Sequence, residues 1–291
     1  MKNKLFLFFI TLSLISIKAN AQLFYKIEGN NIEKPSYIFG SHHMAPVSVA
    51  ENNHVFEHFD EIDQVIGEID LTRDLTAVAL ASQKYMMAPE DSTLSKLYSP
   101  EDFSRLNEEF KKWAPTPGMD LKMIEIFKPM VISTMVTTTM IGESLPEYNI
   151  GEVIDKYIQD YGVKQGKNIR PLETTEFQAE ILYGSVPISI QAEMLSELLD
   201  NPAETLTSTE KLNKAYMEGN LEALLELSQE DNSHPEFMNT LLEKRNSDWL
   251  VKLPEMISDQ PALIVVGALH LAGENGILEG LRKQGYTVTP M

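Results

Sequence analysis

The sequence contains no cysteine in its 291 residues and few basic side chains. Without cysteine, neither a disulfide framework nor a lipid-modified N-terminal cysteine is possible, so the stability of the fold must come from packing. Lysine and arginine total 24 against 43 aspartate and glutamate residues, which gives a formal net charge of −19. Because such an acidic protein repels phosphate backbones and anionic head groups, we expect neither a nucleic acid nor a membrane surface as partner.

No apolar run near the N-terminus reaches the length of a membrane span. Leu5–Ile17 is uncharged, follows Lys2 and Lys4, and leads to the small residues of Ala19–Ala21. A membrane-crossing helix needs about 20 apolar residues, whereas a basic start, a short apolar run and an A-x-A site are typical of a secretory signal peptide. We predict that residues 1–21 are a signal peptide cut after Ala21, and that the mature chain is secreted or periplasmic without a stable membrane anchor.

Six short runs are predicted to be β-strands, and the first two are rich in β-branched or aromatic residues. A Gly-Asn-Asn turn and a proline separate the first two, so these are predicted to pair as a hairpin. The fifth is a continuous apolar run, which favours a strand buried on both faces. The predicted strands are Leu23–Ile27, Ser36–Phe39, Gln64–Asp70, Asn168–Leu172, Ala262–Val266 and Tyr286–Thr289.

The segments between these strands are predicted to be mostly helical, above all from about Leu71 to Tyr161. Ser99–Glu101 is a good helix start, and the nearly uncharged Pro129–Ile141 has the length of a buried helix rather than of a membrane span. Further helices are predicted at Asn149–Tyr161, Pro187–Leu199, Ser208–Met217, Pro235–Val251 and Gly276–Lys283.

The order of strands and helices predicts an α/β fold, with a central mixed sheet flanked by helices and a helical insertion. No long linker, charge block or low-complexity tract interrupts the chain. We therefore predict that residues 22–291 form a single domain.

Two copies of the pattern Gly-x-x-His follow apolar strands at opposite ends of the mature chain, at Gly40–His43 and Gly267–His270. A glycine lets the backbone turn or approach closely, and the histidine then projects from the carboxyl end of its strand, where α/β proteins build their sites. Glu68 lies at the end of a third predicted strand. Two imidazoles and a carboxylate would suit a catalytic metal, which needs three protein ligands and an open position for water.

A structural role for these histidines is the competing interpretation. A histidine at a strand end is commonly a capping or hydrogen-bonded residue, and a single Gly-x-x-His string fixes only two positions. The second copy and the nearby Glu68 support a metal site, and both interpretations stay open at this point. His54, His58 and His234 lack a comparable context and are interpreted as ordinary helix or loop residues.

Two further charged residues are candidates for the same site. Glu173 follows the predicted strand that ends at Leu172, so it could support a metal ligand or merely carry a negative charge at a helix start. Arg245 lies in the predicted long helix before Trp249. It could stabilise a developing oxyanion or pair with acidic residues, and spacing alone favours the structural pairing.

The chain resembles the TraB/GumN family, also called TraB/PrgY/GumN, which includes the Tiki extracellular proteases. The resemblance covers nearly all of the mature chain. It rests on Tyr37–His43, Gly67–Asp70, Lys167–Glu173 with Gln178, Arg245–Asn246 with Trp249, Val266–Leu271 and Gly285–Val288.

This resemblance implies a fold similar to that of erythromycin-esterase and ChaN-like proteins, with the active cleft at the strand ends. It places the family's two histidines on His43 and His270, its acidic residue on Glu68 and its helical arginine on Arg245. The Tiki members are metal-dependent peptidases described with manganese or cobalt rather than zinc, which implies a divalent Mn or Co cofactor and a peptide or protein substrate. His42 stands where the family has a small apolar residue.

The leading hypothesis is a metal-dependent hydrolase of the peptidase kind, in which His43, Glu68 and His270 hold the metal. Arg245 would stabilise the tetrahedral oxyanion and Glu173 would orient a ligand, while the choice of carboxylate as general base stays open. The alternatives are a non-enzymatic cleft binder of peptide, haem or metal, and a structural protein with a degenerate site.

Overall fold

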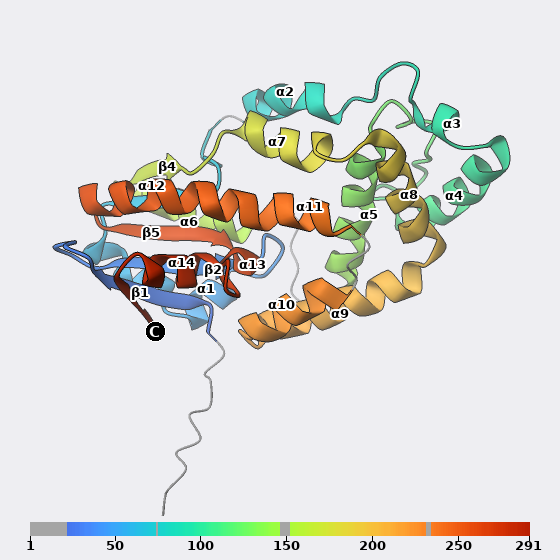
Figure 1. Ribbon diagram of the computed structural model, residues 1–291. Coiled ribbons are helices and arrows are strands. Elements are labelled where there is room, and N and C mark those ends of the chain that lie inside the picture. Colours follow the sequence, from blue (N-terminus) through green and yellow to red (C-terminus); the bar gives the residue numbers. More distant parts are fainter. Residues whose placement is uncertain (1–21, 74, 146–151, 231–233) are drawn as a thin grey trace, which may run out of the picture.

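The computed structural model describes residues 22–73, 75–145, 152–230 and 234–291. The predicted signal peptide and the first residues of the helix predicted at Asn149 lie outside these ranges. Six strands form one mixed sheet in the order β4-β3-β5-β2-β1-β6 (Figure 1). The strands are β1 (Phe24–Gly29), β2 (Ser36–Ser41), β3 (Gln64–Gly67), β4 (Asn168–Pro171), β5 (Ala262–Gly267) and β6 (Tyr286–Pro290).

The four strands β4, β3, β5 and β2 run parallel, and β1 runs antiparallel to both of its neighbours, β2 and β6. Gly40 on β2 is level with Val266 on β5, so the two Gly-x-x-His strands are neighbours. Gly67 on β3 is level with Val265 on β5 and with Pro171 on β4. All four parallel strands therefore end at the same edge of the sheet, and the predicted α/β class with a mixed sheet is confirmed.

The third strand ends at Gly67, earlier than predicted. Beyond it, the side chain of Gln159 rather than a neighbouring strand forms hydrogen bonds with the backbone of Ile69 and Leu71. Gln159 donates a hydrogen bond to the carbonyl of Ile69 at 3.0 Å and accepts one from the backbone N–H of Leu71 at 2.8 Å. A Cβ on Gly67 would lie 2.2 Å from the Gln159 amide nitrogen. The chain therefore leaves the sheet before Glu68, which projects from the edge instead of lying within the strand.

Alternate residues of the central strands point to opposite faces of the sheet and form two apolar cores. Val65 and Val265 belong to the first core, which is covered by α1 (Ser48–Asn52), η1 (Val55–Glu61) and α6 (Ile154–Lys164). Ile66 and Ile264 belong to the second core, which is covered by α12 (Arg245–Asp259) and α14 (Ile277–Lys283). The central strands β2, β3 and β5 are therefore buried on both faces, as the apolar run of β5 predicts.

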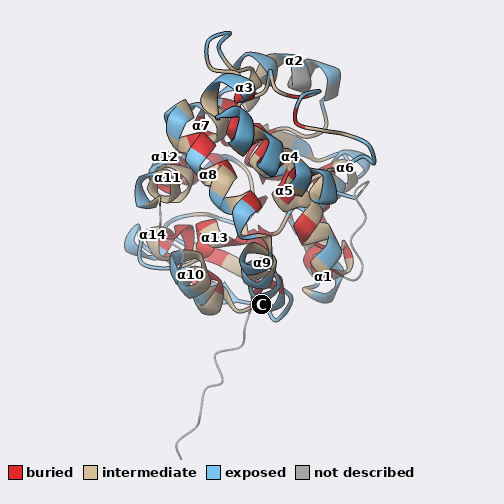
Figure 2. Cartoon of the chain, turned by 90° about the vertical axis from the view of Figure 1, so that its right-hand side faces the viewer, coloured by how far each residue is buried: buried red, intermediate tan, exposed pale blue. Residues whose placement is uncertain are grey.

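A third core lies among helices inserted between the strands, and these helices extend beyond the carboxyl edge of the sheet (Figure 1). From another side, Figure 2 shows exposed residues along α9 and α10. No helix in the described ranges is both long and apolar enough to cross a membrane. The remaining helices are α2 (Leu75–Met86), α3 (Leu94–Leu97), α4 (Pro100–Trp113), α5 (Pro129–Ser144), α7 (Thr175–Gly184), α8 (Ile188–Asp200), α9 (Pro202–Met217), α10 (Leu221–Glu230), α11 (Pro235–Asn239), η2 (Thr240–Lys244) and α13 (Ala268–Leu271).

The helices agree with the sequence at some of their ends and differ at others. The helix predicted at Ser208–Met217 ends at Met217 as predicted but begins earlier, at Pro202. Ser99 caps α4 by accepting a hydrogen bond from the backbone N–H of Asp102 at 3.1 Å, as predicted. The long helix predicted to stop near Val251 continues to Asp259 through an internal Pro254. Burial of its apolar face against the sheet outweighs the cost of the proline, which is about 3 kcal/mol in an isolated helix interior.

Gly40 is the point at which the first Gly-x-x-His motif contacts the second. A Cβ on Gly40 would lie 2.8 Å from Leu271 Cδ1 and 3.1 Å from the Ala268 Cα, both in α13. Because backbone atoms cannot move aside as a flexible side chain can, only glycine lets α13 lie this close to β2. The two motifs are thus packed against each other by the glycine of one of them.

Replacing Gly40 with alanine should destabilise the protein by about 1–3 kcal/mol, because the added methyl overpacks the β2–α13 contact. Urea unfolding followed by circular dichroism measures this change. Gly184→Ala is the matched control, since its Cβ would meet only a Glu180 side-chain carbon at 3.7 Å. Equal stability of Gly40→Ala and the control would contradict the close approach.

Candidate functional site

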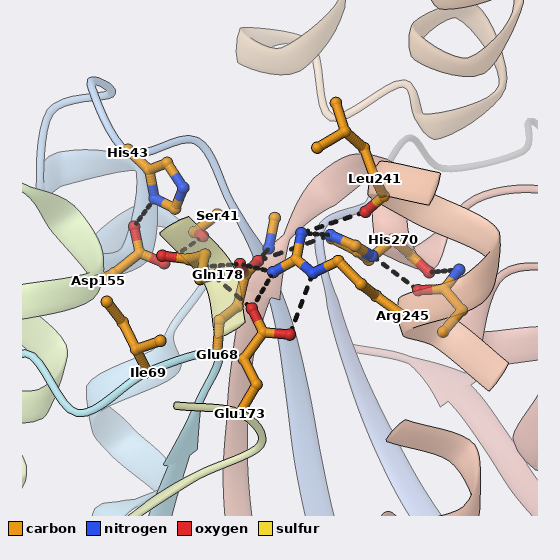
Figure 3. A network of polar contacts seen from close by, with 12 residues as sticks. Ser41, His43, Glu68, Ile69, Asp155, Glu173, Gln178, Leu241, Arg245 and His270 are labelled. Carbon is orange, nitrogen blue, oxygen red and sulfur yellow. Dashed lines mark hydrogen bonds and ion pairs between the residues drawn. The ribbon is translucent and has the colours of Figure 1, made fainter. Parts of the chain in front are cut away.

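The parallel strands deliver the predicted site residues to one edge of the sheet. His43 follows β2, Glu68 follows β3, Glu173 follows β4, and His270 lies in α13 directly after β5. Arg245 is the first residue of α12, which packs on the same sheet. Figure 3 shows His43 and His270 on opposite sides of the contact between Glu68 and Arg245.

Arg245 is at the centre of a buried polar network, and each of its five N–H groups has a partner. Its Nη2 donates to Glu68 Oε2 and to Glu173 Oε1, each at 2.6 Å, and its Nε donates to Glu173 Oε2 at 3.2 Å. Its Nη1 donates to the Leu241 carbonyl and to His270 Nε2, each at 3.1 Å. The guanidinium therefore joins residues from three strand ends in one hydrogen-bonded unit.

A π-helical turn places this arginine. η2 (Thr240–Lys244) is a π-helix that joins α11 directly to α12, and Arg245 is the residue that follows it. Such turns alter the regular backbone pairing and are frequent at functional sites. Here the carbonyl of Leu241 accepts a hydrogen bond from the Arg245 side chain. The turn fixes both the position and the direction of the guanidinium.

The network contains two carboxylates, Glu68 and Glu173, and both pair with the guanidinium of Arg245. Burial alone would raise the pKa of Glu68, but His270, Arg245 and the backbone N–H of Gly267 together hold that pKa below its ordinary value. Burial raises the pKa of Glu173 despite its contact with Arg245. Because His270 is neutral at pH 7, the cations that keep Glu68 ionised are Arg245 and the protonated His43. Removing one partner from such a buried unit costs about 3–5 kcal/mol.

His270 is buried, with 4% of its surface exposed, and its hydrogen bonds define its tautomer. Asn246 donates through Nδ2 to the carbonyls of His270 and Asn275, so its Oδ1 is left to accept the Nδ1–H of His270 at 2.7 Å. The Nε2 lone pair of His270 then faces Arg245 and lies 3.8 Å from Glu68 Oε1. Burial lowers the pKa of His270 to about 4, so its imidazole is neutral at pH 7.

His43 has the same motif position but the opposite environment. Its side chain is 60% exposed, and its Nδ1 lies 2.7 Å from Oδ2 of the buried Asp155 in α6. Asp155 also accepts a hydrogen bond from the Ser41 hydroxyl on its other oxygen at 2.5 Å. The Asp155 carboxylate raises the pKa of His43 to about 9, so this imidazole carries a proton at pH 7.

His42, which departs from the family pattern, is part of the loop structure. Its Nδ1 accepts the backbone N–H of Met44 at 3.2 Å, and its ring lies against Tyr216 at 5.3 Å between centroids. Burial lowers the pKa of His42 to about 4. A neutral His42 with a backbone partner stabilises the turn that presents His43.

The remaining histidines make local contacts outside this network. His54 pairs with Glu57 at 2.8 Å and His58 pairs with Glu61 at 2.9 Å, each within its own short segment. His234 lies 3.8 Å from Glu197. None of these contacts involves the residues at the carboxyl edge of the sheet.

Sequence reasoning missed Asp155 and the roles of two amides. Asp155 is a carboxylate on the buried face of an amphipathic helix, next to Ile154, and that unusual placement was its only local signal. Gln178 donates to Glu68 at 3.1 Å and to Glu173 at 3.2 Å, so it holds the two carboxylates together. Asn246, which stood beside Arg245 in the sequence, fixes the tautomer of His270.

The donor chemistry of the site suits a divalent metal, although the ligands are not gathered. The described residues contain no set of three or more histidine, aspartate and glutamate side chains at metal-binding spacing. His270 and Glu68 nevertheless supply a neutral imidazole nitrogen and an ionised carboxylate. Both His43 and His270 have Nδ1 held by a side-chain oxygen, as metal-ligating histidines usually do.

The fold and the site together define an α/β protein with a polar centre at the carboxyl ends of parallel strands. A model of the TraB/PrgY/gumN family matches residues 23–290. The chain therefore belongs to the TraB/PrgY/gumN family, which confirms the resemblance found in its motifs. Neither the curated proteins nor the solved structures contain a match to this chain.

In metal-free protein, Asp155→Asn should lower the pKa of His43 from about 9 toward its ordinary value of 6.5, because Asp155 raises this pKa more than the other nearby carboxylate, Glu68, does. NMR titration of the imidazole resonances measures this value. Since folding raises this pKa, the pair stabilises the fold fully below pH 6.5 and loses that contribution as pH rises through about 9.

Asp160→Asn is the matched control for this titration, because Asp160 lies on the same helix and pairs with Lys156. This variant should leave the His43 titration where it is in the unmodified protein. A His43 pKa near 9 in the Asp155→Asn variant would contradict this prediction, because it would mean that a group other than Asp155 raises the pKa.

Proposed function

We propose that the chain is a hydrolase of the peptidase kind, and that His43, Glu68 and His270 hold a divalent metal, manganese or cobalt. The observation that carries the proposal is that the two histidines are positioned in the same way. They follow neighbouring strands, each is held at Nδ1 by a side-chain oxygen, and ionised Glu68 lies between them (Figure 3). The predicted signal peptide would place this activity in a secreted or periplasmic protein.

A bound divalent ion would supply Lewis acidity and lower the pKa of a water molecule at the site. His43 must give up its proton to serve as a ligand, because metals bind the deprotonated imidazole. His270 is already neutral, but its Nε2 must be released by Arg245 Nη1. The His43 side chain is 60% exposed with its Nδ1 held by Asp155, and no described residue pairs with its Nε2, which is therefore the nitrogen that would face a metal.

The roles of Arg245 and Glu173 follow from their partners. All five N–H groups of Arg245 are engaged, so it first acts as a positioning residue that keeps Glu68 ionised and orients His270. If His270 Nε2 bound a metal, Arg245 Nη1 would lose this partner and could donate to an oxyanion instead. Metal binding and the predicted oxyanion role of Arg245 are therefore compatible. Glu173, whose pKa is raised by burial, is better suited than Glu68 to accept a proton as general base.

The purified protein should contain about one manganese or cobalt ion per chain after loading, and His43→Ala and His270→Ala should each lose it, because each removes one of three ligands. Elemental analysis after gel filtration measures the content. Loading at pH 7 should also release about one proton, from His43. Calorimetry in buffers of different ionisation enthalpy measures this release.

The control for metal content is His54→Asn, which removes an exposed histidine that also pairs with a glutamate. Asparagine is chosen because His54 has a positive φ of 58°, which asparagine tolerates. The metal site is refuted if the three variants and the parent retain equal metal while circular dichroism shows that all are folded.

A peptide library incubated with the loaded protein should yield cleavage products, and Glu68→Gln should reduce the cleavage rate by about 100-fold or more. Mass spectrometry of the products with and without added manganese measures the activity. Retention of peptides without cleavage, at equal metal content, would instead establish the alternative of a non-enzymatic binder.

A further inference from the structure

A pocket separate from the polar network lies between η1 and α6. It encloses about 320 Å³, which is at the lower end of the roughly 300–1,000 Å³ of small-ligand sites. An α-helix turns about 100° per residue, so the pocket residues of α6 leave the helix on a different side from Asp155. The lining residues are Glu51, His54, Phe56, Glu57, Tyr157 and Tyr161.

Three aromatic rings form the walls of this pocket, and their planes are steeply inclined to one another. Phe56 meets Tyr161 at an interplanar angle of 67° with centroids 5.0 Å apart, and it meets Tyr157 at 80° and 5.9 Å. Behind them, the buried Phe59 packs edge-on against Tyr161 at 86° and 4.7 Å. Phe56 also stacks on Phe59, at 20° and 5.9 Å, so one of its faces is covered. Tyr157 is 41% exposed and lines the pocket together with Tyr161.

The charged groups around the rings are acidic. Among the described residues that line the pocket, Glu51 and Glu57 are acidic and none is a lysine or an arginine. The Glu57 and His54 side chains are 70% and 68% exposed, so the carboxylate stays near solvent at the rim. The formal charge of −19 on the whole chain adds a long-range attraction for cations.

We propose that the pocket of η1 and α6 binds an organic ammonium group. The negative faces of aromatic rings attract cations, and sets of aromatic rings are the usual recognition device for quaternary ammonium ligands. The two carboxylates repel anions and leave neutral apolar ligands without a favourable charge interaction. The ammonium group could belong to a small amine or to a lysine side chain of a peptide, and both share this chemistry.

Isothermal titration calorimetry of the purified protein with three probes tests this assignment. Choline represents the small quaternary amine, N-acetyl-lysine amide represents the peptide side chain, and 3,3-dimethylbutanol is the neutral isostere of choline. At least one of the two cations should bind at millimolar concentration or below, and should bind more tightly than the neutral isostere. The cation that binds identifies the source of the ammonium group.

Two variants test whether the binding is at this pocket. Tyr157→Leu should weaken cation binding by roughly three- to tenfold, because it removes one aromatic wall whose residue is already 41% exposed. Glu57→Gln should weaken it at low salt and have little effect at about 1 M salt, where surface charges are screened. Neither residue belongs to the polar network at the strand ends.

The matched controls are Phe177→Leu, which removes a 43% exposed aromatic ring on α7, and Glu236→Gln, which removes an exposed carboxylate on α11. Both should bind the cation as the parent does. Absence of binding by either cation, equal binding of the neutral isostere, or equal losses in the pocket variants and the controls would each overturn the proposal. These measurements need no hydrolytic activity and are independent of the metal.

Discussion

The five hydrogen bonds of one guanidinium hold the site together. Arg245 lies in a helix that covers the sheet, and its partners come from the ends of β3 and β4 and from the helix after β5. A buried cation between two carboxylates is stable only when every donor has an acceptor, and here every donor has one. The geometry at the carboxyl edge of the sheet thus depends on where α12 begins, and a π-helical turn sets that position.

The two Gly-x-x-His motifs place chemically different histidines at one edge. Burial makes His270 neutral with a pKa of about 4, whereas Asp155 makes the exposed His43 cationic with a pKa of about 9. Identical motifs therefore supply a lone pair on one side of Glu68 and a proton on the other. A site with both can bind an ion only by expelling a proton, which couples its occupancy to pH.

The central strands and the edge where their side chains meet could be predicted from local pattern, because short apolar runs such as that of β5 favour strands buried on both faces. The partners of the site residues could not. Asp155 lies 112 residues from His43 in the sequence, and Arg245 lies 177 residues from Glu68, so no local periodicity encodes either contact. The extension of α12 past Pro254 likewise follows from the burial of Met256 and Ile257 in the core beneath the helix rather than from helix propensity.

The strand order has a consequence for the sequence of folding events. β5 lies between β2 and β3, although more than two hundred residues separate β2 from β5 along the chain. Until β5 is available, β2 and β3 have no common neighbour, and each exposes an edge to unwanted pairing. Sheets built from such distant segments form slowly, because loop closure precedes the contacts that reward it. This architecture therefore leaves two unpaired strand edges on the partly folded chain until the last third of the sequence joins the sheet.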